Sequence, residues 1–283
     1  MSSMSTRGRA VRNNAEAQGE RVANNDQFEW LARAGLAARG VVYGLIGILA
    51  VKLALGDGGK TTNQQGALKT IAHQPFGKIL LGLVAVGLAG YALWRLVRAA
   101  IGHGPESGED DAKERISGVV SGIAYGGLCI TAVSILLGSG GGGGASSHPG
   151  KTTGGVLDWP GGQVLVGLVG LIIIGVAGEQ AYKGIKQKFL EKSKTEEMGH
   201  RMEQVFTGVG VAGHLARAVV FALIGYFLVR AAIDYNPDKA IGLDGALSKL
   251  AQNSYGPVLL GIVAAGLVAF GLYSLFDARY RKV

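Results

Sequence analysis

Charged residues, proline and cysteine are all scarce in this sequence. Asp, Glu, Lys and Arg make up 17% of 283 residues, below the roughly 25% of ordinary soluble domains. Such a low charge, with 48% hydrophobic residues, excludes a disordered chain apart from local tails. The single cysteine, Cys129, permits no internal disulfide and no thiolate metal cage. Only six prolines occur, and the 48 glycines follow no three-residue period, which excludes collagen.

Long apolar stretches separate the clumps of charge. Residues 116–149 include no Asp, Glu, Lys or Arg. A helix that crosses a ~30 Å hydrocarbon layer needs about 20 mostly apolar residues. The apolar stretches that fit such helices are centred on residues 41–51, 79–93, 119–137, 164–178, 219–229 and 258–276. The sequence therefore predicts an all-α integral membrane protein with six transmembrane helices.

Basic residues gather on one side of these predicted spans. The two termini and the second and fourth connections carry eighteen Lys and Arg residues, whereas the odd-numbered connections carry six. The positive-inside rule therefore places both termini in the cytoplasm of a multi-pass protein of the cell (inner) membrane. The net charge of +8 then describes loops that face the anionic cytoplasmic leaflet of the bilayer. No nucleic-acid-binding motif accompanies the charge, so nucleic acid is not an expected partner.

One hairpin of two helices occurs three times along the chain. Aligning Arg39 with Arg217 also aligns the Gly-Ala-Leu segments at residues 66–68 and 245–247. Each repeat is a helix, an outer connection that carries a short segment of this type, and a returning helix. Because each copy starts and ends on the same side, the repeats are parallel and related by an axis along the membrane normal. We therefore predict a pseudo-threefold bundle.

The repeats set the expected organisation of the chain. We expect a disordered basic tail (1–29), repeat 1 (30–102), an acidic cytoplasmic linker (103–114), repeat 2 (115–189, with a Gly-rich outer loop at 138–155), a charged cytoplasmic linker (190–206) and repeat 3 (207–283). The middle copy has Ser121 and Ser134 where the flanking copies carry basic residues. Any functional symmetry is therefore expected to be broken in repeat 2.

Three strings of the sequence carry a family resemblance. They are WLARAGLAARGVVYGLIG from residue 30, PFGKILLGLVAVGLAGYALWRLVRA from residue 75 and GLDGALSKLA from residue 242. In this order and spacing the chain resembles, over residues 30–281, the bacterial membrane family called domain of unknown function 1206. The resemblance implies three two-helix repeats and six spans. It implies no activity, because the family is itself uncharacterised.

Small residues recur four positions apart in the first helix of each repeat. The pairs are Gly40/Gly44, Gly122/Gly126 (extended back to Gly118) and Ala218/Ala222. Helix association in lipid depends on close backbone approach through small residues. We expect these faces to pack inside the monomer, with an oligomer interface as the alternative. Cys129 aligns with glycines of the flanking repeats, so it is predicted to be a small packing residue.

Three ionisable residues are predicted to share one depth in the membrane. Arg39 and Arg217 are equivalent in repeats 1 and 3, and Glu179 stands near the end of the fourth span. The functional hypothesis is an Arg–Glu–Arg cluster on the pseudo-threefold axis that forms an ion relay, a gate or an anionic-ligand site. The alternative is that both arginines snorkel separately and that Glu179 pairs with Lys183 four residues later.

Motifs for catalysis or cofactor binding do not stand out. Residues 54–61 and 145–152 match a relaxed phosphate-loop pattern, but both are predicted outer loops with no preceding strand, so nucleotide is not expected. His214 is predicted to be a packing residue rather than a ligand. No nucleophile–base pair or metal-ligand spacing is present in the sequence. We expect neither an enzyme nor a cofactor or metal.

Other features favour an architectural role. Trp30, Trp94, Trp159 and Tyr273 fall at predicted span ends and suggest an interfacial aromatic belt. The charged connection at 183–204 is predicted to extend the fourth span as an amphipathic helix that could dock a soluble partner. The leading hypothesis is a non-enzymatic structural or accessory membrane protein that packs against another membrane protein or a second copy of itself. The alternative is a small channel or transporter that uses the Arg–Glu–Arg layer.

Overall fold

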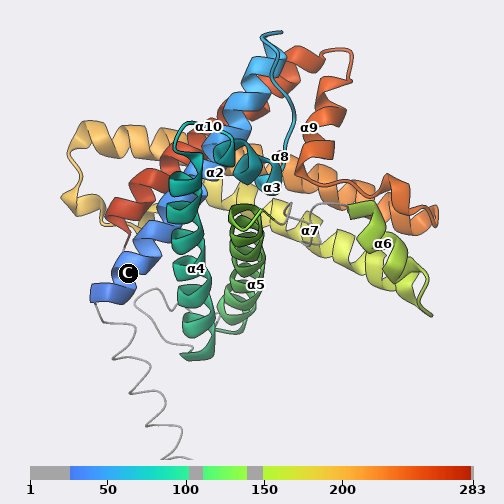
Figure 1. Cartoon of the computed structure of the whole chain (residues 1–283), viewed down its shortest axis with the longest axis horizontal. Coiled ribbons are helices and arrows are strands. Elements are labelled where there is room, and N and C mark those ends of the chain that lie inside the picture. Colours follow the sequence, from blue (N-terminus) through green and yellow to red (C-terminus); the bar gives the residue numbers. More distant parts are fainter. Residues whose placement is uncertain (1–25, 102–110, 139–148, 282–283) are drawn as a thin grey trace, which may run out of the picture.

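Three stretches of the chain, residues 26–101, 111–138 and 149–281, are described by the computed structural model (Figure 1). Within them the chain is helical and contains no β-strand. The helices are α2 (Asp26–Ala54), α3 (Gln64–Ala72), α4 (Gly77–Ile101), α5 (Asp111–Leu136), α6 (Pro149–Leu157), α7 (Gly162–Ile185), α8 (His200–Ile233), α9 (Leu243–Ala251) and α10 (Gly256–Tyr280). Most of the predicted N-terminal tail (residues 1–25), most of the acidic linker (102–110) and the central part of the Gly-rich outer loop (139–148) lie outside the described residues.

Six of the described helices are long and apolar enough to cross a membrane, as predicted: α2, α4, α5, α7, α8 and α10. A short helix follows the first, third and fifth of them. Asn63 caps the first short helix, because its side chain accepts a hydrogen bond of 2.9 Å from the Gly66 amide. The aligned Ala-Leu pairs at residues 67–68 and 246–247 are all fully buried. The same segment therefore packs in the same way in the first and third repeats.

The long helices pack in a regular order. The returning helix of each repeat packs on the first helix of the next, which gives the pairs α4–α5, α7–α8 and α10–α2. Helices also pack within repeats 1 and 3, as the pairs α2–α4 and α8–α10. In the described part of the second repeat, α5 and α7 form no comparable interface. Figure 1 shows α4 and α5 side by side, with α7 running away from them along α8.

Glycines bring the first and last long helices into backbone contact. A Cβ on Gly40 of α2 would lie 2.8 Å from the carbonyl oxygen of Gly271 in α10, and a Cβ on Gly271 would lie 2.8 Å from the amide nitrogen of Gly44. In α5, Gly118 faces Ala99 and Gly122 faces Leu96, both on α4. The remaining predicted packing positions differ from one another. A Cβ on Gly126 would approach only Ala92 of α4. Ala218 is buried, whereas Ala222 is exposed.

One contact recurs between successive repeats. A Cβ at Gly47 of α2 would lie 2.8 Å from the carbonyl oxygen of Ala264 in α10. A Cβ at Gly225 of α8 would lie equally close, 2.8 Å, to the carbonyl oxygen of Gly170 in α7. Both interfaces therefore exclude a side chain at the same point of the first helix.

Cys129 occupies the corresponding point of the middle repeat. Its Sγ lies 3.4 Å from the carbonyl oxygen of Ala85 in α4. Ala85 and Ala264 are equivalent residues of the returning helices, because each stands three residues after one of the aligned glycines Gly82 and Gly261. Cys129 is thus a small packing residue at a repeated helix contact.

The predicted aromatic belt holds only in part. Trp30 and Trp159 are 73% and 63% exposed, as an interfacial residue would be. Trp94 and Tyr273, in contrast, are 2% and 3% exposed and belong to the core. They are equivalent residues of the returning helices α4 and α10, which both pack on α2. The belt prediction was wrong for these two because their helices are enclosed by neighbours at that depth.

Candidate functional site

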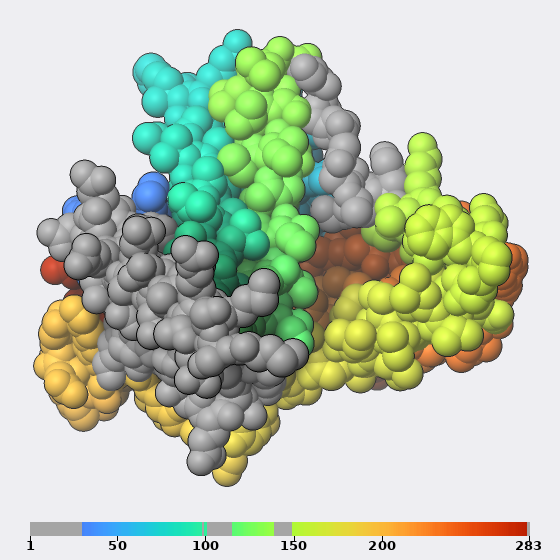
Figure 2. All heavy atoms as spheres, turned by 90° about the horizontal axis from the view of Figure 1, so that it is seen from below, coloured from blue at the N-terminus to red at the C-terminus, as the bar shows by residue number. Residues whose placement is uncertain are grey.

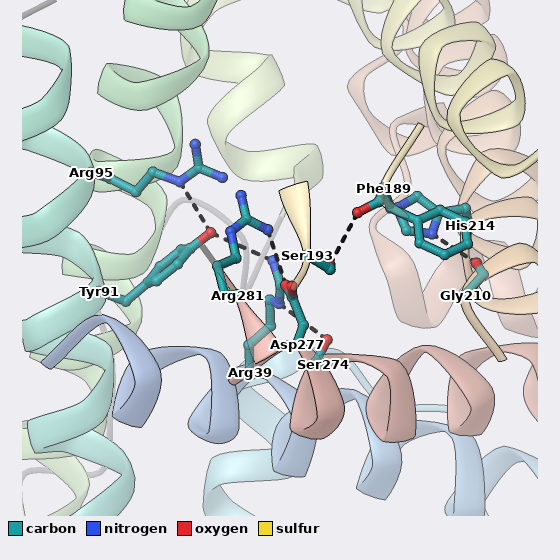
Figure 3. A network of polar contacts seen from close by, with 10 residues as sticks. All are labelled: Arg39, Tyr91, Arg95, Phe189, Ser193, Gly210, His214, Ser274, Asp277 and Arg281. Carbon is teal, nitrogen blue, oxygen red and sulfur yellow. Dashed lines mark hydrogen bonds and ion pairs between the residues drawn. The ribbon is translucent and has the colours of Figure 1, made fainter. Parts of the chain in front are cut away.

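A buried carboxylate lies at the centre of a charge network that joins three long helices (Figure 3). Asp277 of α10 is fully buried. Its Oδ2 accepts hydrogen bonds from Nη2 of Arg39 at 3.4 Å and from Nη1 of Arg281 at 3.0 Å. Both arginines are buried, at 8% exposure. A carboxylate inside a membrane protein is tolerated when it is paired in this way.

The remaining nitrogens of Arg39 extend the network to α4 and along α10. Nε of Arg39 donates to Oγ of Ser274 at 3.2 Å, and Nη1 donates to the hydroxyl of Tyr91 at 3.5 Å. That hydroxyl also accepts a hydrogen bond of 3.0 Å from Nε of Arg95. The network therefore fixes α2 between α4 and α10.

Local sequence explains the polar groups that the end of α10 brings to the network. Ser274, Asp277 and Arg281 follow one another at spacings of three and four residues, so they share one face of the helix end. Backbone contacts hold that end, since the Lys194 amide donates to the Tyr280 carbonyl at 2.7 Å and Ser193 forms an isolated antiparallel bridge with Arg281. The connection between α7 and α8 thus covers the network.

This connection does not have the predicted form. The prediction of an amphipathic extension of the fourth span was wrong, because α7 ends at Ile185 and the chain continues through two 3₁₀ turns, η1 (Leu190–Lys192) and η2 (Thr195–Glu197). Phe189 and Met198 are buried at 4% and 8% exposure. These apolar anchors pull the segment onto the bundle instead of leaving it as a solvated helix.

Arg217 lies in a different environment from its repeat equivalent. Its guanidinium carbon stands 4.4 Å from the ring centre of Phe270, 5.0 Å from that of Phe221 and 5.4 Å from that of Tyr43. Its Nε is buried and has no hydrogen-bond partner among the described residues, and the same is true of Oε1 of Gln180. Aromatic faces attract the cation, but they provide no counter-charge.

Arg217 also borders a cavity of about 570 Å³. The apolar part of the cavity wall comes mainly from α7 and α8, whereas the polar groups Asn63, Gln64, Thr152 and Thr153 belong to the short helices or their caps. The lining is Tyr43, Asn63, Gln64, Pro149, Thr152, Thr153, Val156, Leu165, Val166, Val169, Ile173, Arg217, Val220, Phe221, Ile224, Leu228, Ile241, Gly242, Leu243 and Leu267. The volume and the lining are those of a pocket for a small, largely apolar molecule.

The three residues of the predicted charge cluster lie in two arrangements. Arg39 and Arg217 both approach the ring of Phe270, with guanidinium carbons 5.2 Å and 4.4 Å from its centre. Glu179 forms an ion pair of 3.0 Å with Lys183, four residues along α7. The carboxylate that pairs with Arg39 is that of Asp277. A functional Arg39–Glu179–Arg217 cluster remains a prediction.

Sequence reasoning overlooked Asp277 and counted Arg281 only among the basic residues of the tail. Asp277 is nevertheless the only acidic residue in the last long helix, and Arg281 follows it four positions later. A lone carboxylate near the end of an apolar span usually seeks a cation. That signal identifies Asp277 as a candidate.

His214 is buried among aromatic side chains in the structure. Its Nδ1 lies 2.7 Å from the Gly210 carbonyl oxygen, and its ring stacks on Phe189 with centres 5.1 Å apart (Figure 3). Among the residues described, no group of three or more His, Cys, Asp or Glu side chains is placed to hold a metal ion.

Comparison with known proteins identifies similar sequences. The family model for Domain of Unknown Function (DUF1206) matches residues 34–112, 116–187 and 212–281. These segments correspond to the three repeats. The chain is also 35% identical over 254 residues to an uncharacterized protein of Bacillus subtilis (strain 168), YxxB, and the match covers 89% of this chain and 90% of that protein. No solved structure matches the chain.

Proposed function

Because the chain belongs to the DUF1206 family, whose sequence repeats coincide with its three helix pairs, we propose that it is a non-enzymatic structural or accessory protein of the bacterial cell membrane. In this role it packs against another membrane protein. The buried Asp277 carboxylate supports the non-enzymatic part, since its two guanidinium partners hold it in a structural contact in which Arg39 links α2 to α10.

The main support for this proposal is the exposed apolar surface of the second repeat. In the most apolar part of α5 and of α7, 17% of residues are buried, compared with 56% in α2 and 50% in α10. Large apolar side chains are exposed on both helices, among them Ile123 of α5 and Ile172 of α7 at 66% and 57%. Helices in lipid gain stability from packing against other helices. Within the described residues, α5 and α7 share no extensive interface, so their exposed apolar faces offer a surface for a transmembrane partner.

Photo-crosslinking in cells of the native host tests this surface. A photoreactive amino acid would replace Ile123 or Ile172 in the full chain. Matched controls would carry it at Leu83 of α4 or Ile262 of α10, which are each 66% exposed but lie outside the second repeat. We expect a protein adduct of one discrete mass at Ile123 and Ile172 and lipid adducts at the controls. Lipid adducts at all four positions would contradict the proposal.

The proposal includes a pseudo-threefold arrangement with both termini in the cytoplasm. Its support is the repeated pairing of α4–α5, α7–α8 and α10–α2 and the excess of basic residues in the termini and even-numbered connections. These connections would face the anionic leaflet. A reporter enzyme that is active only outside the cytoplasm, fused at the C-terminus, is expected to be inactive, whereas its activity would contradict this topology.

The cavity beside Arg217 favours one alternative, a small channel or transporter. That function requires an aqueous path to the arginine layer, and the polar groups of Asn63, Gln64 and Thr152 at one end of the cavity provide a possible mouth. Charged thiol reagents would then reach a cysteine placed at position 217. The mostly apolar wall supports the accessory function more strongly, because an apolar surface offers an ion nothing in place of its water shell.

A further inference from the structure

Arg217 lacks the counter-charge that its repeat equivalent Arg39 has. The Arg39 guanidinium pairs with the Asp277 carboxylate at 3.4 Å and also donates to Ser274. Among the described residues, no carboxylate lies within ion-pair distance of Arg217, and Nε of Arg217 is buried without a partner. Two arginines at the same place in two repeats therefore have opposite electrostatic surroundings.

The difference arises from the helix that packs on each arginine. Gly261 of α10 is aligned with Gly167 of α7. Sixteen residues after these glycines, α10 carries Asp277 and α7 carries Lys183. Helix α10 packs on α2, which carries Arg39, and α7 packs on α8, which carries Arg217. The position that supplies a carboxylate to Arg39 in one interface is thus occupied by a lysine in the interface that contains Arg217. Lys183 is itself paired with Glu179 at 3.0 Å.

An unpaired cation inside a membrane protein is unfavourable unless an anion joins it. Three aromatic rings within 5.4 Å of the Arg217 guanidinium carbon supply part of the missing attraction. They also exclude water from the flanks of the guanidinium. A negatively charged group that reached Arg217 from the cavity would complete the site.

The cavity is shaped for an apolar chain attached to such a group. Beyond Arg217 its wall consists of aliphatic side chains on the facing sides of two helices, Val169 and Ile173 of α7 and Ile224 and Leu228 of α8 among them. A volume of about 570 Å³ falls within the range of pockets that enclose one drug-sized molecule. A phospholipid with two acyl chains is larger than such a molecule.

The open second repeat provides access from the bilayer. Helices α5 and α7 share no extensive interface within the described residues. Figure 2 shows the surface hollowed between α5 and α7, with atoms of the C-terminal third of the chain at the bottom of the hollow. None of the cavity's lining residues belongs to α5, so the proposed route for an amphiphile dissolved in the membrane runs through this hollow, on the side of the cavity that α5 leaves uncovered.

From these observations we propose that the cavity binds a single-chain amphiphile with a carboxylate headgroup, of the long-chain fatty-acid class. The carboxylate pairs with Arg217, and the chain lies along the aliphatic wall between α7 and α8. A guanidinium and a carboxylate form a strong, directional ion pair. The ligand thus supplies a carboxylate to Arg217, as Asp277 does to Arg39.

Photo-labelling of the full chain in phosphatidylcholine vesicles tests the site. The probe is a palmitic acid analogue with a diazirine in its chain, and adducts are mapped by mass spectrometry. We expect adducts on peptides of α7 and α8. Palmitate is expected to compete for the site, and cetyl alcohol, which has the same chain without the carboxylate, is expected to compete at least about tenfold less well, as for loss of one partner of a desolvated charge pair.

Matched variants locate the headgroup. Arg217→Gln should reduce labelling about tenfold or more, whereas Arg230→Gln, at an exposed position of the same helix paired with Asp234, should leave it unchanged. Val169→Trp should block labelling by filling the cavity. The competition between palmitate and cetyl alcohol needs no variant. It therefore tests whether the site requires a carboxylate even if a variant does not fold. Undiminished labelling of folded Arg217→Gln, or equal competition by cetyl alcohol, would overturn the proposal. So would competition by phosphatidylglycerol without competition by palmitate, since that result indicates a phospholipid site.

Discussion

The Asp277 carboxylate lies 3.4 Å from the guanidinium of Arg39, a residue 238 positions away in the chain. This contact joins the last long helix, α10, to the first, α2. It lies in the interface that completes the series of pairs α4–α5, α7–α8 and α10–α2. Because both side chains are buried, neither can exchange its partner for water. The pair therefore fixes the relative position of repeats 1 and 3.

Replacing Asp277 by Asn should destabilise the protein strongly. The substitution leaves Arg39 and Arg281 buried without their shared carboxylate, and breaking a buried pair in this way costs about 3–5 kcal/mol. We expect a clear fall in the free energy of unfolding, measured by denaturant titration of the purified protein in detergent.

Asp234→Asn is the control for this prediction. Asp234 pairs with Arg230 at 3.3 Å and with Lys239 at 2.7 Å, but these are surface contacts at the end of α8. Exposed ion pairs contribute little to stability. An equal loss in both variants would show that Asp277 has no special structural role.

The two equivalent arginines should respond differently to the same substitution. Arg39→Gln leaves Asp277 with one cation instead of two and should lower stability by about 3 kcal/mol. Arg217→Gln removes a cation without a described carboxylate partner and forfeits contacts with three rings, worth about 1–2 kcal/mol at most. Thermal unfolding of both variants in one detergent compares them. The prediction fails if Arg217→Gln is the more damaging change.

Gly271→Ala should weaken the contact between α10 and α2. The added Cβ would stand 2.8 Å from the amide nitrogen of Gly44, so the helices must separate, at a cost of about 1–3 kcal/mol. Gly175→Ala on α7 is a matched control because nothing lies within 4 Å of its added Cβ. We expect the unfolding midpoint to fall only for Gly271→Ala. No difference between the two variants would mean that the close approach is not needed.

The spans and repeats were predictable because they depend on local composition. Apolar length locates a transmembrane helix, and alignment of Arg39 with Arg217 locates the internal repeat. The Ala-Leu pairs of these aligned segments are buried alike in the first and third repeats, in keeping with that alignment. Trp94 and Tyr273 were misassigned because hydropathy gives the depth of a residue but not the number of helices that surround it.

The charge network was less predictable because it depends on which helices become neighbours. Depth alone made Glu179 the natural partner for Arg39 and Arg217. The structure packs α10 on α2 instead, which brings Asp277 to Arg39, and Lys183 pairs with Glu179 within one turn of α7. The cavity was equally hidden, because its lining comes from helices of all three repeats, from Tyr43 of α2 to Leu267 of α10, rather than from one sequence motif.

Thiol labelling at position 217 tests most directly whether the protein is a lipid-embedded framework without an aqueous path. Arg217→Cys would be made in a Cys129→Ala background. The control for reagent access is Lys60→Cys, at an exposed position of the connection that is predicted to lie outside. The account predicts that a lipid-soluble maleimide labels Cys at position 217 and that charged, membrane-impermeant reagents do not label it from either side. Labelling by a charged reagent from the side that reaches position 60 would contradict the account and favour a channel or transporter.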